Sequence, residues 1–155
     1  MRQVESDMRP LAAERGLSLK FVPTSLSVHS DRALLRRLIQ NLVSNAVKYT
    51  RTGKVVVGVR HRNKTDFELE VVDSGIGIPA DKLDSIYTEF VRLDEGSRTA
   101  SGLGLGLSIV RRITERLGGT CGVESSPETG TRFWFALPCA SETSARAPLA
   151  LTAVA

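Results

Sequence analysis

The sequence is poor in cysteine and in long apolar runs, and these absences exclude several classes of protein. Its 155 residues include two cysteines, Cys121 and Cys139, whose contexts match no metal-binding spacing. Two isolated cysteines are typical of reduced thiols in a cytoplasmic protein. No apolar run approaches the length of a membrane span, and the N-terminus lacks the apolar segment of a secretory signal. We therefore expect a cytoplasmic domain without membrane contact, so that any anchor would belong to other segments of a longer protein.

Strong charge asymmetry is also missing. The formal net charge is only +4, and the basic residues are spread along the chain. Proteins that bind nucleic acids usually carry a basic block or a basic stripe with interleaved aromatic residues. The sequence has neither, so we expect no nucleic-acid partner. Its length fits one domain with a single core of ordinary size.

Hydrophobic periodicity predicts an α+β domain. The two expected hairpins favour a mixed, mostly antiparallel sheet with helices packed on one face, rather than a doubly wound parallel sheet. Asp31 or Ser30 is expected to cap the central helix. A polar stretch, 94–101, is expected to form a mobile loop. The predicted helices cover residues 1–15, 32–48 and a segment that ends at 118, and the predicted strands cover 16–22, 54–62, 66–73, 120–125 and 131–137.

The first stretch with chemical potential is the predicted central helix, "LLRRLIQNLVSNAVKYT". Asn45 lies about 20° from Leu38 around the helix axis and so falls within the apolar face, with Asn41 and Lys48 on its flank. A buried amide is unfavourable unless it is hydrogen-bonded, so Asn45 is either a core residue bound to backbone or part of a site. In the second interpretation its amide oxygen binds a hard cation, while the ammonium of Lys48 meets a phosphate.

The second stretch, "VVDSGIGIP", ends a predicted strand at Asp73 and continues into a turn that contains Gly75 and Gly77. An ordinary turn at a strand end explains the glycines but does not require the carboxylate. A carboxylate in this position can accept a hydrogen bond from an exocyclic amino group, and the glycines let a flat ring approach the backbone.

The third stretch, "SGLGLGLSIV", places Gly102, Gly104 and Gly106 just before an amphipathic helix. Its spacing is not that of a dinucleotide-binding or P-loop motif. A plain glycine-rich linker is one interpretation. The other is a phosphate site, because the free N–H groups at a helix N-terminus attract anions. Arg92 and Arg98 on the preceding loop could add cationic contacts or could be ordinary surface charges.

Four stretches occur together and in order: "NLVSNAVKYT", "DSGIGI", "IYTEFVRLD" and "GLGLGLSIV". They closely resemble the N, G1, F and G2 boxes of the sensor histidine kinases, which belong to the GHKL superfamily of ATP-binding proteins. The resemblance covers residues 16–138. It implies a Bergerat fold, in which ATP lies between the helices and a flexible lid.

The resemblance also implies roles for individual residues. Asp73 is expected to bind the adenine amino group, and Asn45 is expected to bind Mg²⁺. Lys48 and Tyr49 are expected near the phosphates or ribose, and the glycines of the G2 box are expected to close the lid, residues 94–104. The expected catalytic residues are Asn41, Asn45 and Lys48, and the expected cofactor-binding residues are Asn45, Lys48, Tyr49, Asp73, Gly75, Gly77, Ile78, Phe90, Arg92, Arg98, Gly102, Leu103, Gly104, Leu105, Gly106 and Leu107.

Two departures from the wider superfamily shape the functional prediction. Members that hydrolyse ATP carry a glutamate one turn before the metal-binding Asn, whereas this sequence has Asn41 there, as the kinases do. An amide is a poor general base, so attack by water should be slow. The family's phosphoacceptor motif is absent, because His29 and His61 lack its acidic neighbour.

The sequence therefore resembles the catalytic part of a histidine kinase. We expect residues 1–15 to be the end of an upstream dimerisation helix or linker, 16–138 the ATP-binding catalytic domain and 139–155 a linker or disordered tail. The expected cofactors are ATP and Mg²⁺, and the expected partners are the dimerisation and phosphoacceptor domain of the same kinase and a downstream receiver domain. The alternatives are a serine-directed kinase of the anti-sigma-factor type and a nucleotide-binding module without catalytic activity.

Overall fold

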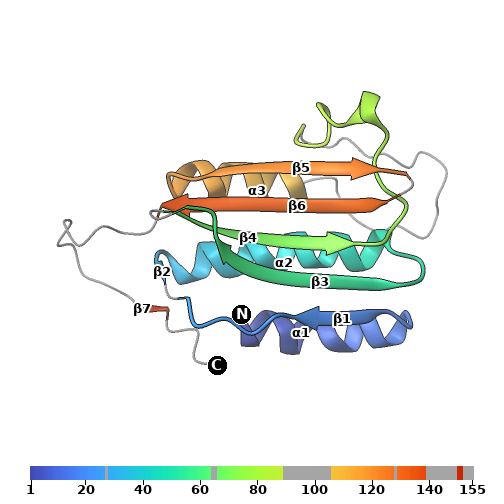
Figure 1. The fold of residues 1–155 in the computed structure, drawn as a ribbon, viewed down its shortest axis with the longest axis horizontal. Coiled ribbons are helices and arrows are strands. Elements are labelled where there is room, and N and C mark those ends of the chain that lie inside the picture. Colours follow the sequence, from blue (N-terminus) through green and yellow to red (C-terminus); the bar gives the residue numbers. More distant parts are fainter. Residues whose placement is uncertain (27, 64–65, 89–105, 128, 139–149, 152–155) are drawn as a thin grey trace.

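The chain folds into a layer of helices on one face of a five-stranded sheet (Figure 1). The computed structural model describes residues 1–26, 28–63, 66–88, 106–127, 129–138 and 150–151. In chain order its elements are α1 (Arg2–Glu14), β1 (Ser18–Phe21), β2 (Val28–His29), α2 (Arg32–Tyr49), β3 (Lys54–His61), β4 (Asp66–Asp73), the 3-10 helix η1 (Ala80–Lys82), α3 (Gly106–Arg116), β5 (Thr120–Ser126), β6 (Gly130–Pro138) and β7 (Ala150–Leu151).

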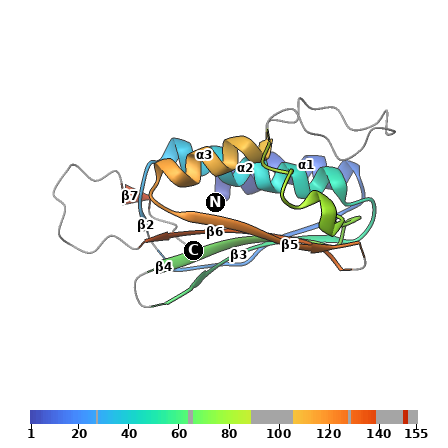
Figure 2. The same ribbon diagram turned by 90° about the horizontal axis from the view of Figure 1, so that it is seen from above.

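The sheet has the strand order β1-β3-β4-β6-β5. β1 pairs with β3 in parallel, whereas the other neighbouring strands are antiparallel. Figure 2 shows that α1, α2 and α3 all lie on the same side of the sheet. The predicted mixed, mostly antiparallel sheet with helices on one face is confirmed.

Strand alternation separates the two faces of the sheet. On β4, Phe67, Leu69 and Val71 are all buried in the core between the sheet and the helices. Successive side chains of a strand point to opposite faces, so Glu68 and Glu70 lie on the outer face. The helix-covered face therefore provides the apolar core, and the outer face carries charged side chains.

α2 is the central helix of the covering layer. Its side chains Leu38, Leu42, Val43 and Val47 are at most 1% exposed. Truncating such a residue, as in Leu42→Ala, removes apolar contacts and leaves a cavity, which destabilises a protein by about 2–5 kcal/mol. The helix begins after Asp31, whose Oδ1 accepts hydrogen bonds from the N–H groups of the second and third helical residues at 2.8 and 3.0 Å. Of the two predicted caps, Asp31 is the one used.

α1 packs against α2 and belongs to the same core. Its buried face consists of Val4, Met8 and Ala12, which recur at the spacing of one helical face. Its exposed side is tied to α2 by an ion pair between Asp7 and Arg36, whose N···O distance is 3.0 Å. The helix predicted over residues 1–15 is thus present, and its assignment to the end of an upstream dimerisation helix stays a prediction.

Three short elements were not anticipated, η1 and the strands β2 and β7. β2 and β7 form a separate two-stranded antiparallel sheet, in which Val28 pairs with Leu151. β7 lies within the segment 139–155, which we expected to be a linker or disordered tail, and the rest of that segment is outside the described residues. Two-residue strands carry too little periodic signal to be recognised from a pattern. None of the helices in the described part of the chain is both long enough and apolar enough to cross a membrane.

Candidate nucleotide-binding site

The amides of Asn41 and Asn45 lie on α2 against the first residue of α3. A Cβ atom placed on Gly106 would lie 3.4 Å from Nδ2 of Asn45 and 3.5 Å from Oδ1 of Asn41. Nδ2 of Asn41 donates a hydrogen bond to the carbonyl of Arg37 at 2.8 Å, which fixes the orientation of that amide. Asn45 is half-buried, and among the described residues its amide has no hydrogen-bond partner. The two helices therefore bring together a pair of amides and a helix N-terminus.

The last turn of α2 carries Lys48 and Tyr49, both half-buried. Nζ of Lys48 lies 5.1 Å from the centroid of the Tyr49 ring, within the range of a cation–π contact. The carbonyl of Tyr49 accepts a hydrogen bond from the N–H of Ile76 at 3.3 Å. The end of α2 is thus joined to the turn that follows β4, so that the first two stretches lie close together.

Asp73 is the last residue of β4, and it is buried, with 6% of its surface exposed. Burial raises the pKa of its carboxyl group, because desolvation disfavours the charged form. The backbone N–H groups of Gly75 and Thr131 oppose this shift by donating hydrogen bonds to the carboxylate, the first at 2.8 Å. No salt bridge to Asp73 occurs within the described ranges, so the carboxylate keeps acceptor capacity for a ligand.

The turn after Asp73 requires glycine at two positions. A Cβ on Gly75 would lie 2.7 Å from the Tyr49 carbonyl oxygen and 2.7 Å from Oδ1 of Asp73. Gly77 has a φ of +68°, and a Cβ there would lie 2.0 Å from the carbonyl oxygen of Ser126. Contacts this short exclude any side chain, so both glycines serve a close approach of backbone segments.

Ile78, at the end of this turn, is hydrogen-bonded to Ser125, a residue that the sequence did not suggest. Ile78 is buried, and its N–H donates a hydrogen bond to Oγ of Ser125 on β5 at 2.8 Å. Thr131 lies directly opposite Asp73 in the β4–β6 register and is also buried. Ser125 and Thr131 were missed because neither belongs to a motif with a functional spacing, and only the strand pairing brings them beside Asp73.

α3 provides the remaining part of the candidate site. Gly106 begins the helix and Leu107, the next residue, is half-buried against the core. The buried residues Val110 and Ile113 form the apolar face of the helix. The other predicted contacts of the F and G2 boxes lie outside the described residues, namely Phe90, Arg92, Arg98, Gly102, Leu103, Gly104 and Leu105. The predicted lid, 94–104, lies there as well.

The metal prediction depends on one residue, Asn45. In the described ranges no group of three or more His, Cys, Asp or Glu side chains could hold a metal ion. Mg²⁺ commonly takes only one or two protein ligands and completes its shell with phosphate oxygens and water. The amide oxygen of Asn45, half-buried and without a partner among the described residues, fits such a shared site and not an all-protein metal cage.

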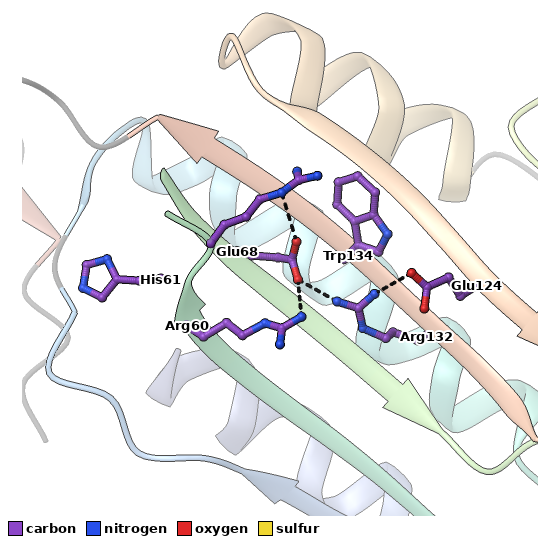
Figure 3. Close-up of a pocket in the computed structure, with 7 residues that line it drawn as sticks. Arg60, His61, Glu68, Glu124, Arg132 and Trp134 are labelled. Atoms are coloured by element: carbon purple, nitrogen blue, oxygen red, sulfur yellow. Dashed lines mark hydrogen bonds and ion pairs between the residues drawn. The ribbon is translucent and has the colours of Figure 1, made fainter. Parts of the chain in front are cut away.

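A hollow of about 380 Å³ lies on the outer face of the sheet, away from these residues (Figure 3). At its centre Glu68 accepts hydrogen bonds from Arg60 at 2.9 Å and from Arg132 at 2.6 Å. Arg132 also donates to Glu70 at 2.8 Å and to Glu124 at 2.9 Å; burial of its guanidinium opposes ionisation, but its pairing with Glu70, and then with Glu124 and Glu68, outweighs this and raises its pKa. Three arginines, Arg60, Arg62 and Arg132, are paired here with three glutamates, Glu68, Glu70 and Glu124, so we regard the hollow as a structural network.

Comparisons with known proteins agree with the geometry. Residues 30–141 match the family described as histidine kinase-, DNA gyrase B-, and HSP90-like ATPases. The chain is 39% identical over 127 residues to the aerobic respiration control sensor protein ArcB of Escherichia coli, covering 79% of this chain and 16% of ArcB. It is 36% identical over 126 residues to the sensor histidine kinase GacS of Pseudomonas protegens, covering 78% of this chain and 14% of GacS. The chain thus spans only a small part of these relatives.

Solved structures give the same result. Full-length ShkA, in complex with AMPPNP, superposes with a TM-score of 0.81 at 32% identity, over 92% of this chain and 30% of ShkA. The mycobacterial sensor histidine kinase MprB superposes with a TM-score of 0.71 at 26% identity, over 88% of this chain and 93% of the MprB chain. The chain belongs to the histidine kinase-, DNA gyrase B- and HSP90-like ATPase family, as an ATP-binding domain of the sensor histidine kinase type.

Proposed function

We propose that this chain binds Mg·ATP and donates the γ-phosphoryl group to a histidine on a separate dimerisation and phosphoacceptor domain of the same kinase. The names of its relatives support this proposal, since GacS is a sensor histidine kinase and LuxQ of Vibrio vulnificus is an autoinducer 2 sensor kinase/phosphatase. ShkA, which is similar over most of this chain, was solved with AMPPNP, an ATP analogue. The downstream partner would be a receiver domain, and the domain would act in the cytoplasm, where ATP is available.

The observation that carries the proposal is the buried Asp73 carboxylate beside the glycine turn. Within the described chain it accepts hydrogen bonds only from backbone N–H groups, and it has no cationic partner there. An acceptor of this kind matches the exocyclic amino group of adenine, which is a donor. The ring would lie beside the turn that contains Gly75 and Gly77, next to the Asp73 carboxylate. Asp73 would thus select the base, and Ile78 would line the apolar side of the base-binding site.

The phosphates would extend from the base toward the amides of α2 and the N-terminus of α3. Lys48 would contribute charge, and Asn45 would provide the protein ligand for Mg²⁺, which supplies positive charge between the phosphate oxygens. The free N–H groups of a helix N-terminus favour phosphate at Gly106. Phosphoryl transfer needs mainly such positioning and charge stabilisation from the protein.

In the proposed transfer an imidazole nitrogen of the acceptor histidine forms a bond to the γ-phosphorus. The bond from that phosphorus to the oxygen bridging the β-phosphate breaks, and ADP leaves. Asn41 stands one turn before Asn45, where a hydrolytic enzyme needs a general base, and an amide cannot take a proton from water. ATP would therefore be preserved for the histidine.

The test is transfer of label from γ-labelled ATP to the purified dimerisation domain of the same kinase. We expect an acid-labile, alkali-stable label, which is typical of phosphohistidine. Asn45→Ala should abolish it, whereas Gln3→Ala, which removes an exposed amide of α1, should leave it unchanged. An acid-stable label on serine would favour a serine-directed kinase, and nucleotide binding without transfer would favour a binding module.

A further inference from the structure

Ser125 lies at the centre of a hydrogen-bond network that joins the glycine turn to the β5–β6 hairpin. Its Oγ accepts a hydrogen bond from the N–H of Ile78 at 2.8 Å. The same oxygen lies 3.0 Å from the carbonyl oxygen of Gly130 and 2.9 Å from Oγ1 of Thr131. Three contacts at ordinary hydrogen-bond length therefore converge on one half-buried hydroxyl group.

The directions of these hydrogen bonds follow from counting protons. A serine hydroxyl has one donor and two acceptor sites, and the carbonyl of Gly130 can only accept. If Ser125 donates to Gly130, its two acceptor sites receive the N–H of Ile78 and the hydroxyl proton of Thr131, so that all three contacts are satisfied. If Ser125 donated to Thr131 instead, two acceptor oxygens would face each other at Gly130. The first arrangement is therefore the stable one.

This network holds Asp73 from both sides. One arm reaches the end of the turn that begins at Asp73, through Ile78. The other arm reaches Thr131, which lies directly opposite Asp73 in the sheet and donates its backbone N–H to the Asp73 carboxylate. A Cβ on Gly130 would lie only 2.1 Å from the carbonyl oxygen of Asp73, so the hairpin also approaches the Asp73 backbone closely.

We propose that Ser125 is a positioning residue for base recognition, which makes the site selective for adenine by fixing the glycine turn and Thr131 around Asp73. This inference rests on the proposed function, because it assigns the base to Asp73. Without the Ser125 hydroxyl the N–H of Ile78 and the carbonyl of Gly130 lose their partner. The turn can then shift relative to the carboxylate, and the distinction between adenine and a base with a carbonyl in that position weakens.

The chain offers a matched control in the adjacent residue. Among the described residues, Oγ of Ser126 contacts only Thr129, lying 2.8 Å from its Oγ1 and accepting its N–H at 3.3 Å. Ser125→Ala and Ser126→Ala remove the same atoms from neighbouring positions of one strand. We expect Ser125→Ala to weaken ATP binding about tenfold and to lower the ratio of ATP to GTP affinity, whereas Ser126→Ala should change both less than about twofold.

The experiment is calorimetric titration of the wild-type chain and the variants with ATP and GTP, beside thermal unfolding of each protein. Ser125→Thr keeps the hydroxyl and should retain the wild-type ratio. If Ser125→Ala does not fold, Ser125→Cys replaces it, because a thiol is a weak acceptor of similar size. A folded Ser125→Ala or Ser125→Cys variant with unchanged selectivity would overturn the proposal, even if its melting temperature were lower. An equal loss in Ser126→Ala would also overturn it.

The outcome for the wild-type chain separates this inference from the proposed function. If the wild type binds neither nucleotide, the proposed function fails, and the role of Ser125 in base recognition fails with it. If the wild type prefers ATP and Ser125→Ala keeps the full preference, the proposed function stands and only the positioning role is lost.

Discussion

Two buried carboxylates on β4 have opposite surroundings. Glu68 is 4% exposed and is contacted by arginines on the outer face of the sheet. Asp73 is 6% exposed on the helix-covered face, and within the described part of the chain its partners are backbone N–H groups. A buried charge without a counterion is unfavourable. The fold neutralises Glu68 internally, whereas it leaves Asp73 with acceptor capacity that a ligand can use.

The largest expected effect follows from removing the charge of Asp73. Asp73→Asn should weaken ATP binding by about 2–3 kcal/mol, because a hydrogen bond to a charged acceptor becomes a neutral one and an NH₂ group crowds the base. Folding should not suffer equally, since burial disfavours the ionised carboxyl in the free protein. Calorimetry and denaturant unfolding of the same samples measure the two effects. If Asp73→Asn loses stability but keeps ATP affinity, Asp73 is a structural residue, as Glu68 is, and does not recognise the base.

The reverse result is expected for Glu68. Glu68→Gln should lower the free energy of unfolding by about 1–3 kcal/mol, because Arg60 and Arg132 lose the charge of the buried carboxylate that they share, although Arg132 keeps its ion pairs with Glu70 and Glu124. The affinity for ATP should stay within about twofold of the wild type, since the outer face is separated from Asp73 by the sheet. Glu115→Gln is the control for a surface ion pair. Glu115 is an exposed residue of α3 that pairs with Arg111 at 3.2 Å, so its substitution should change stability little. Loss of ATP affinity in Glu68→Gln would contradict this prediction, because it would show that the outer face of the sheet affects nucleotide binding at Asp73.

The effect of pH on ATP binding should be smaller than the effects of these two substitutions, over the pH range in which the protein stays folded. The pKa of Asp73 in the folded protein lies above its ordinary value of 3.8. The carboxyl group therefore becomes protonated, and ATP affinity falls, as the pH falls through this raised pKa. For folding the sign is opposite. The ionised carboxylate lowers stability above the folded pKa, and protonation removes this cost as the pH falls toward 3.8. Titration at several pH values should show the dependence in the wild type and a flatter profile in Asp73→Asn.

The smallest expected effect concerns Tyr87, whose hydroxyl group is buried and has, among the described residues, no partner at hydrogen-bond geometry, only the weakly interacting thiol of Cys121 nearby. Burial raises the pKa of Tyr87 well above its ordinary value. If the Tyr87 hydroxyl does not bind a ligand, Tyr87→Phe removes a poorly paired polar group whose burial is unfavourable. The free energy of unfolding should then rise by about 0.5–1 kcal/mol, and ATP affinity should stay unchanged. Tyr87→Leu is the control, because it also removes the ring that lies 6.0 Å below the Arg111 guanidinium. A loss of ATP affinity in Tyr87→Phe would assign that hydroxyl to the nucleotide site.

The sequence predicted the fold well because its signals are local. Apolar residues such as Leu38 and Leu42 recur at helical spacing, Asp31 is a preferred cap, and alternation on β4 marks its buried face. The short pair β2–β7 had no such signal. That Asn41 and Asn45 lie close to Gly106 could be expected only from the resemblance, because the motifs that contain them occur together in one chain.

The residues that the sequence did not reveal act over long separations. Ser125 bonds to Ile78, 47 positions away, and Arg132 bonds to Glu68, 64 positions away. A serine or an arginine in a strand is usually a solvated side chain, so neither residue type predicts such a contact. Strand register creates these pairs, and register becomes visible only when the sheet is assembled. The roles of the lid residues stay predictions, since those residues lie outside the described ranges.

The attachment of α1 has a mechanical consequence. Near its middle α1 is tied to α2 by the ion pair between Asp7 and Arg36, and just after its end Arg15 donates a hydrogen bond to the carbonyl of Lys48 at 3.1 Å. A helix fastened at one point can pivot, whereas a helix fastened at two separate points must move together with its support. Displacing α1 would therefore push on the very turn of α2 that carries Lys48 and Tyr49, by a route that bypasses the sheet.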